Sequence, residues 1–217
     1  MQVTFPNENT KYRAARAKLL KAEIDLRRQA EKVAALRRKL PQGGEVPEDY
    51  VFEGEQGPVK LSELFVRGNT LIAYSFMFGP KMPQACPMCT SFIDGLNGNA
   101  MHINQRTNLV VIAKSPFDRI RQYAQSRGWS NLRLLSSANN NYNRDYHGEA
   151  PEGEQMPIFN VFRKNKAIRH FYASEMIFAR TDKGQDPRAI DLMWPLWNVL
   201  DLTPEGRGKD WYPKLQY

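Results

Sequence analysis

The sequence predicts an α/β fold built on a parallel sheet with crossover helices. Residues 70–78 (TLIAYSFMF) form a nearly continuous apolar run, as expected for a strand that is covered on both faces. Two further apolar strand candidates lie at 109–113 and 132–135. Segments with helical patterns separate the three runs, and this alternation of strand and helix is typical of parallel sheets with crossover helices.

The first crossover helix is expected to begin at the two cysteines of the chain, in the stretch ACPMCT. Pro87 suits the first turn of a helix. The residues that then recur at the spacing of one helix face are Cys89, Phe92, Ile93 and Leu96. We therefore expect Cys89 to begin the buried face and Cys86 to lie at the exposed tip. The second crossover helix is expected to follow Ser115 as N-cap and to stop at Gly128.

The rest of the domain is predicted from shorter patterns. Short strands are expected at 50–52 and 59–61, and the polar stretch 136–143 is expected to be a loop. Strands at 158–162 and 167–172 should form a hairpin, with Asn165 at positive φ in its turn. A last helix is expected from Asp186 to Leu200, kinked or divided by Pro195, with Ile190, Trp194 and Trp197 in core packing.

Residues 10–40 predict one long helix with Thr10 as its N-cap. The residues at seven-residue spacing within it are Tyr12, Leu19, Leu26, Val33 and Leu40. This heptad pattern is typical of a helix that packs against another helix. Since Pro41-Gln42-Gly43-Gly44 forms a hinge-like break, we expect two parts. They are a basic helical extension at 1–42, used for packing or dimerisation, and a domain at 43–217, and the extension leads us to expect a homodimer.

The net charge of +8 does not describe a broad basic surface. Residues 1–40 carry eleven Lys or Arg and four Asp or Glu, whereas residues 41–217 carry twenty and nineteen. The excess of positive charge therefore lies in the N-terminal helix, where the first interpretation is a solvated helix face. We do not expect a nucleic acid partner; if there were one, it would bind this helix and its affinity would depend strongly on salt.

Composition also bears on the compartment. No run of eighteen apolar residues occurs, so no membrane span or membrane partner is expected. The first residues, MQVTFPN, lack the layout of a secretory signal, and we expect a cytoplasmic protein. In the cytoplasm a CxxC pair is more often redox-active or metal-binding than a structural disulfide.

The position of the cysteines predicts their chemistry. A helix N-terminus carries a partial positive charge and unpaired N–H groups, which stabilise a thiolate and lower the pKa of Cys86. Cys86 would then attack a thiol or disulfide substrate, whose identity the sequence does not reveal. Cys89 would resolve the mixed disulfide. The sequence thus predicts a thiol–disulfide oxidoreductase that uses the pair Cys86-Pro87-Met88-Cys89.

Two alternatives stay open at this point. The chain could be a metal-binding or interaction module without redox turnover, although a zinc site needs two more ligands and the three histidines form no paired motif. The cysteines could also be inert core residues. We expect neither a metal nor an organic cofactor, since the sequence contains no glycine-rich dinucleotide or phosphate-binding motif.

Met156-Pro157 directly precedes the first strand of the terminal hairpin. If this loop lies against the cysteines, the backbone of Met156 would offer hydrogen bonds to an incoming substrate, and Pro157 and Pro87 would contact it. The peptide bond before Pro157 is either cis, which is usually a deliberate feature of a fold, or trans at an ordinary strand start. His147 and Lys81 are considered as charges near Cys86, and Asp145 as a proton carrier.

Longer stretches resemble a known family. YRAARAKLLKAEIDLRR, DYVFEGEQGPVKLSELF, LIAYSFMFGP, CPMCTSFIDGLNG, NYNRDY and LDLTPEGRG together span almost the whole chain. They are similar to the DUF899 family, a thioredoxin-like family, and the order of elements also resembles peroxiredoxins. The resemblance implies a thioredoxin-like fold with a mixed central sheet and a long N-terminal helical extension. The peroxiredoxin pattern places a Thr or Ser at Pro83 and a proline at Gly79, so peroxide reduction by that mechanism is not expected.

Overall fold

The computed structural model describes residues 3–208 and 210–216. The chain divides into two compact units, Met1–Pro41 and Gln42–Tyr217, which are described separately. In the first unit, helix α1 (Thr10–Arg38) is capped by Asn9, whose side-chain oxygen accepts a hydrogen bond of 2.8 Å from the Tyr12 amide. The expected N-cap, Thr10, is instead the first helical residue, because Asn9 supplies the acceptor. No described residue of α1 is buried.

The apolar residues of α1 motivate a prediction about assembly. Leu19, Leu26 and Leu36 are exposed, and a helix of this length with an uncovered apolar row gains stability by packing against another helix. We expect the intact chain to sediment as a dimer and a truncated chain that begins at Gly43 to sediment as a monomer. If the intact and the truncated protein contain the same number of chains per particle, α1 is not the dimerisation element.

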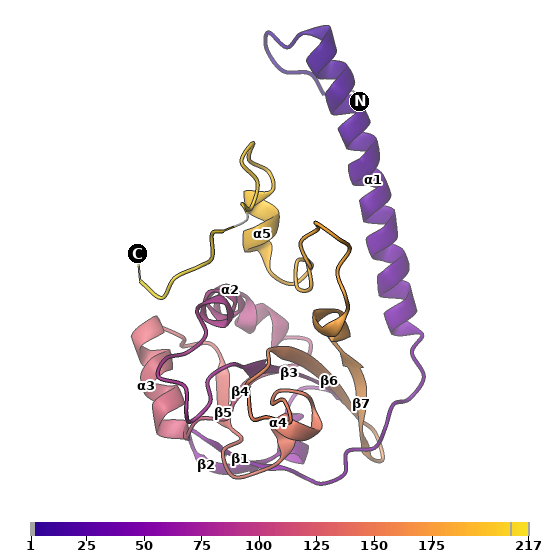
Figure 1. The fold of residues 1–217 in the computed structure, drawn as a ribbon. Coiled ribbons are helices and arrows are strands. Elements are labelled where there is room, and N and C mark those ends of the chain that lie inside the picture. The colour runs from indigo at the N-terminus through magenta and orange to yellow at the C-terminus, as the bar shows by residue number, and fades with distance from the viewer. Residues whose placement is uncertain (1–2, 209, 217) are drawn as a thin grey trace. The chain divides into compact units, whose positions relative to one another are not determined.

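The second unit contains a seven-stranded sheet with helices on both of its faces (Figure 1). The strands are β1 (Val51–Gly54), β2 (Gly57–Lys60), β3 (Thr70–Phe76), β4 (Asn108–Ala113), β5 (Arg133–Ser136), β6 (Ile158–Lys164) and β7 (Ile168–Ala173). The helices are α2 (Pro87–Ile103), α3 (Phe117–Arg127), α4 (Tyr142–Asp145) and α5 (Pro195–Leu200), with short 3-10 helices η1 (Leu61–Leu64) and η2 (Glu175–Phe178).

The strand order is β2-β1-β5-β4-β3-β6-β7. Strands β3, β4 and β5 are parallel neighbours, as their apolar runs and crossover helices predict. The β6–β7 hairpin joins the other side of β3 in antiparallel register, and the β1–β2 hairpin joins β5 in the same way. The sheet is therefore mixed, and the domain has a thioredoxin-like fold. This confirms the fold class expected from the resemblance.

Alternation along β3 divides the core into two layers. Tyr74 and Phe76 face α2 and α3, in the layer that also holds Cys89, Trp194 and Trp197. Leu71 and Ala73 face the opposite layer, which contains Tyr50, Phe52 and Tyr142 of α4. The expected core positions of Trp194 and Trp197 are thus confirmed. The cysteines belong to the α2 side of the sheet.

Four local predictions differ from the structure. The stretch 136–143 contains the start of α4 and is not all loop. Asn165 does not adopt a positive φ; instead its N–H closes the turn on the Ala167 carbonyl at 3.0 Å. Residue 116, not Ser115, is the N-cap of α3. The last helix begins only at Pro195, because a proline is tolerated in the first turn and not further along.

Over the described residues, no helix combines the length and the apolar character that a membrane crossing requires.

Candidate active site

The CxxC pair lies where the loop after β3 enters α2, at the carboxyl ends of the parallel strands. Cys86 is the N-cap of α2, in an extended conformation with φ −61° and ψ 123°, and Pro87 is the first helical residue. The Cys86 amide donates to the Met77 carbonyl at 3.1 Å. The Cys86 carbonyl accepts from both the amide and the hydroxyl of Thr90, each at 2.9 Å. The backbone of Cys86 is therefore held on both sides, which fixes the direction of its side chain.

The two sulfurs differ in accessibility. Both cysteines are free thiols, and Cys89 is 4% exposed whereas Cys86 is partly exposed. The Cys89 amide donates to Cys86 Sγ at 3.5 Å, so the first turn of the helix points a donor at the outer sulfur. This is the arrangement expected from sequence, with an accessible sulfur at the tip and a shielded one on the buried face.

The environment of Cys86 favours its thiolate. Its pKa is lowered from 9.0 to about 6, mainly because the Cys89 side chain donates a hydrogen bond to it. Partial burial opposes this change, and the backbone amides of Cys89 and Met88 support it. Because the largest contribution comes from Cys89, the reactivity of Cys86 depends on its partner as well as on the helix terminus.

Cys89 has the opposite bias. Its hydrogen bond to Cys86 and its burial raise the pKa of this thiol. The Tyr74 hydroxyl and the Met77 amide oppose this by donating to the Cys89 sulfur. Burial in turn raises the pKa of Tyr74, so this hydroxyl remains a donor at neutral pH. Tyr74 therefore stabilises the Cys89 thiolate; the sequence marked it only as a polar residue within an apolar strand.

Arg119 of α3 holds the loop that leads into Cys86. Its guanidinium donates to the carbonyls of Gly79 at 3.1 Å and Pro83 at 3.2 Å, and also to that of Met82. The same group lies 4.3 Å from the centre of the Phe78 ring. One side chain thus fixes a loop that has little regular structure of its own. Sequence reasoning missed this residue, since nothing local links residue 119 to the loop.

A cavity of about 820 Å³ opens beside the pair. Cys86, Cys89 and Pro157 all line it, so the structure brings together three of the predicted site residues. Aromatic side chains form much of the remaining wall: Tyr74, Phe92, Phe159, Trp197, Trp211 and Tyr212. The last three belong to the C-terminal segment (residues 186–216), which sequence reasoning did not connect with the site.

Met156 and Pro87 take less part than expected. The Met156 amide donates to the Gly148 carbonyl at 3.0 Å, so this donor is already used within the domain. Of the Met156 backbone groups expected to bind a substrate, the N–H is thus already engaged, and a substrate contact of this backbone stays a prediction. The bond to Pro157 is trans, as no cis peptide bond occurs among the described residues. Pro87 starts α2 but does not line the cavity.

Gly148 packs closely against Ser75 of β3 because it has no side chain. A Cβ at this position would lie 2.7 Å from Ser75 Oγ and 3.0 Å from Ser75 Cβ, too close for a real contact. The preceding stretch NYNRDY supports the same turn, since Asn143 accepts from Ser137 at 2.9 Å and donates to Gln155 at 3.4 Å. The NYNRDY segment, one of the stretches that resemble the DUF899 family, therefore positions the loop before Pro157.

Three charged residues were considered as partners of the cysteines. Asp145 accepts a hydrogen bond of 2.5 Å from the Tyr50 hydroxyl on the opposite face of the sheet, so the prediction that it serves the cysteines is wrong. His147 lines a separate cavity of about 680 Å³ with His170 and Glu175. Neither His147 nor Lys81 is among the causes of the lowered pKa of Cys86, and their influence on this thiol stays a prediction. The described residues also contain no group of three or more His, Cys, Asp or Glu placed to hold a metal.

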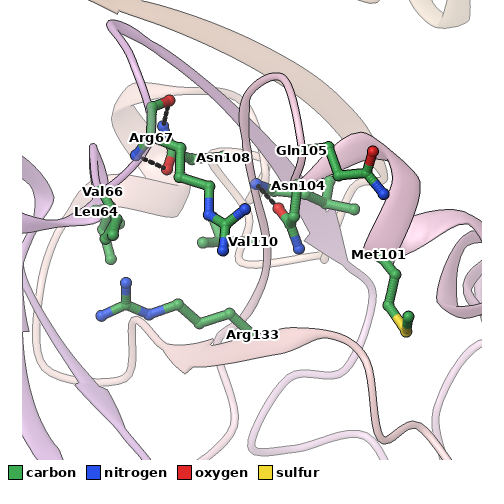
Figure 2. Close-up of a pocket in the computed structure, with 10 residues that line it drawn as sticks. Leu64, Val66, Arg67, Met101, Asn104, Gln105, Asn108, Val110 and Arg133 are labelled. Atoms are coloured by element: carbon green, nitrogen blue, oxygen red, sulfur yellow. Dashed lines mark hydrogen bonds between the residues drawn. The ribbon is translucent and has the colours of Figure 1, made fainter.

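A further pocket lies at the other end of the parallel strands (Figure 2). It measures about 430 Å³, and the side chains of Arg67 and Arg133 reach toward it. The Asn108 amide group is bonded to the backbone of Arg67, with distances of 2.8 and 2.9 Å. The described lining residues include no cysteine, histidine or carboxylate, so this pocket has no group suited to thiol or acid–base chemistry.

Comparison with known proteins identifies the family. A family described as bacterial protein of unknown function, DUF899, matches residues 2–217. The chain belongs to the DUF899 family. This confirms the resemblance drawn from its sequence motifs. No curated protein matches the sequence.

Among solved structures, similarity is distant. The peroxidoxin BcpB of Mycobacterium tuberculosis is 18% identical, with 71% of this chain and 94% of that chain covered and a TM-score of 0.46. Peroxiredoxin Q of Xanthomonas campestris is 14% identical, with 60% and 84% covered and a TM-score of 0.45. The exposed lipoprotein thioredoxin Etrx1 of Streptococcus pneumoniae is 12% identical, with 66% and 95% covered and a TM-score of 0.43. Likeness at this level carries no information about activity.

Proposed function

We propose that this DUF899 protein is a thiol–disulfide oxidoreductase with Cys86 as nucleophile and Cys89 as resolving thiol. The observation that carries the proposal is that the two sulfurs differ in accessibility and in pKa. The accessible sulfur has a pKa of about 6, whereas the pKa of the buried sulfur is raised. A thiolate is the attacking species in disulfide exchange, and a shielded neighbouring thiol is suited to the second step.

The reaction balances with the two cysteines and one disulfide. The Cys86 thiolate attacks a substrate disulfide RSSR, forms a mixed disulfide and releases RS⁻. Cys89 then loses its proton and attacks Cys86 Sγ, which forms the Cys86–Cys89 disulfide and releases the second RS⁻. Two electrons pass from the protein to the substrate, and a reducing dithiol from outside must return them. Tyr74 and the Met77 amide assist the second step because they stabilise the Cys89 thiolate.

A cytoplasmic location forms part of this proposal, because thiols there are kept reduced and a CxxC pair can cycle. Peroxide reduction by the peroxiredoxin pattern is not proposed, since Pro83 and Gly79 occupy the positions where that pattern has a hydroxyl residue and a proline. A metal-binding module is also less well supported, because the described residues near the pair supply no third ligand.

The pH dependence of Cys86 alkylation tests the first step. We expect the rate with iodoacetamide to rise with pH and to have its midpoint near pH 6. Cys89→Ala should move the midpoint toward 9.0, because it removes the largest cause of the lowered pKa. A rise of two pKa units would reduce the thiolate fraction at pH 7 about tenfold.

The matched control is Cys89→Ser, which keeps a hydroxyl donor and should move the midpoint less than the alanine variant. In parallel, the wild-type thiols are titrated against a redox buffer and the Cys86–Cys89 disulfide is measured by mass spectrometry. An ordinary thiol pKa for Cys86 together with no reversible disulfide would reject the proposal.

A further inference from the structure

A connected series of aromatic groups lines the cavity beside Cys86. Phe92 and Phe159 come from α2 and the sheet, with ring centres 5.5 Å apart in an edge-to-face arrangement. Trp197 contacts Trp211 at 6.0 Å and Tyr212 at 6.3 Å, both also edge-to-face. Rings packed in this way offer flat apolar surface to a ligand. The cavity of about 820 Å³ is large enough to bring a small apolar ligand against these rings and near the reactive sulfur.

The charges that line this cavity are already satisfied. Arg188 and Arg207 are the cationic side chains among its described lining residues. Arg207 binds Asp191 at 2.7 Å and Asp201 at 2.6 Å, and Arg188 binds the same two aspartates at 2.9 Å. Asp186 also contacts Arg207 at 3.1 Å, so three carboxylates face two guanidinium groups. With three carboxylates against two guanidinium groups, the formal charge of the cluster is negative, which disfavours an anionic ligand.

The backbone beside the cavity is also occupied. Extended peptides are commonly bound by adding a strand, which requires free N–H and C=O groups along an edge. The Met156 amide next to Pro157 is bonded to Gly148, and the Phe159 amide is bonded to Ser174 Oγ at 2.9 Å. Strand β6 also pairs with β3 on one side and with β7 on the other, so it offers no free edge to which a peptide could add as a strand.

We propose that the substrate is a small, uncharged disulfide with aromatic or bulky aliphatic groups, and not an anionic or extended peptide disulfide. This rests on the proposed function and adds the class of substrate to it. The apolar groups lie against the rings of Phe92, Phe159, Trp197 and Trp211, with the disulfide at Cys86. The first leaving group is a small apolar thiolate, which takes a proton from water; the oxidised pair is returned to the dithiol by an external dithiol reductant.

Two aromatic disulfides of opposite character test the proposal. Dithiodipyridine is uncharged at neutral pH, and dithiobis(nitrobenzoate) carries two negative charges. Rates of reaction with the reduced full-length protein are each divided by the rate with free N-acetylcysteine thiolate, which removes the intrinsic reactivity of the probe. We expect the corrected rate with dithiodipyridine to exceed that with dithiobis(nitrobenzoate) by about tenfold or more, a difference of about 1.4 kcal/mol. Glutathione disulfide should react more slowly still.

Variants locate the selectivity. Trp211→Ala is expected to reduce the ratio of the two corrected rates about threefold to tenfold, because one aromatic wall is lost. The ratio is unaffected by the fraction of folded protein or of thiolate. Ile177→Phe, which fills part of the cavity, should reduce the ratio as well. Leu202→Ala is the matched control: Leu202 lies in the same segment, is 82% exposed and does not line the cavity, so the ratio should not change.

The outcomes separate the two proposals. Equal corrected rates for both probes, with a reversible Cys86–Cys89 disulfide, would overturn the substrate class and leave the oxidoreductase proposal standing. A preference for the anionic probe would do the same. No reversible disulfide and no rate above that of free thiolate would overturn both. A preference for the neutral probe that Trp211→Ala leaves unchanged would show that selectivity arises outside this cavity and would contradict the inference.

Discussion

Cys86→Ser is expected to lower the rate of disulfide reduction by about a thousandfold or more, because it removes the attacking sulfur. Cys89 cannot replace it: this thiol is 4% exposed, and its surroundings raise its pKa. The measurement is the release of thiol from an aromatic disulfide at pH 7 under single-turnover conditions. Residual activity near the wild-type rate would show that Cys86 is not the nucleophile.

The companion variant Cys89→Ser should behave differently from Cys86→Ser. It keeps an accessible thiolate at Cys86, so the first step still occurs and one equivalent of RS⁻ is released. The second step lacks a thiol, and the mixed disulfide should accumulate as a mass adduct of one RS group per chain. Wild-type protein should release two equivalents and show no adduct. An adduct on Cys86→Ser but none on Cys89→Ser would reverse the assigned roles.

The thiol pair itself could be predicted well from sequence because its geometry is local. The spacing of Cys89, Phe92 and Ile93 defines one face of a helix, and this fixes which sulfur is buried. The buried strands 70–78 and 109–113 were equally clear, since both of their faces are apolar. The alternation of these strands with helices also predicted that they are parallel.

The surroundings of the pair could not be predicted because they depend on contacts between distant residues. Arg119 holds the loop before Cys86 from more than thirty positions away, and the Gly148 carbonyl accepts from the Met156 N–H, one of the backbone groups expected to meet the substrate. Tyr74 lies in an apolar strand, and only the register of β3 beside α2 shows that its hydroxyl meets Cys89. The periodicity of apolar residues does not show contacts between residues that are distant in the sequence.

The structure of the C-terminal segment was also hard to predict from sequence. The helix described in it, α5, is short, so the periodicity of apolar residues gives little information there. What orders it is a charge cluster whose members, Asp186, Arg188, Asp191, Asp201 and Arg207, are spread over more than twenty residues. The sequence therefore did not predict that this segment lines the cavity.

Arg207→Met is expected to destabilise this segment by about 1–3 kcal/mol, because Asp191 and Asp201 lose charged hydrogen bonds and keep only those from Arg188. The Arg207 side chain is 9% exposed and binds Asp191 and Asp201, and its guanidinium lies 5.6 Å from the centre of the Trp197 ring. Urea denaturation followed by tryptophan fluorescence measures the effect. Arg188→Met is the matched control; Arg188 is 55% exposed, so we expect a loss of about 1 kcal/mol or less.

The pH dependence of the same variant distinguishes lost charge pairing from lost packing. Hydrogen bonds from Arg207, followed by those from Arg188, hold the pKa of Asp201 at about 2, below its ordinary 3.8, against the opposing effect of burial. A lowered pKa means that the carboxylate stabilises the folded chain above pH 3.8 and loses this effect as the pH falls toward 2. Wild-type stability should therefore fall across this interval, and the fall should be smaller in Arg207→Met. An identical fall in both proteins would show that Arg207 acts through packing and not through its bonds to Asp201.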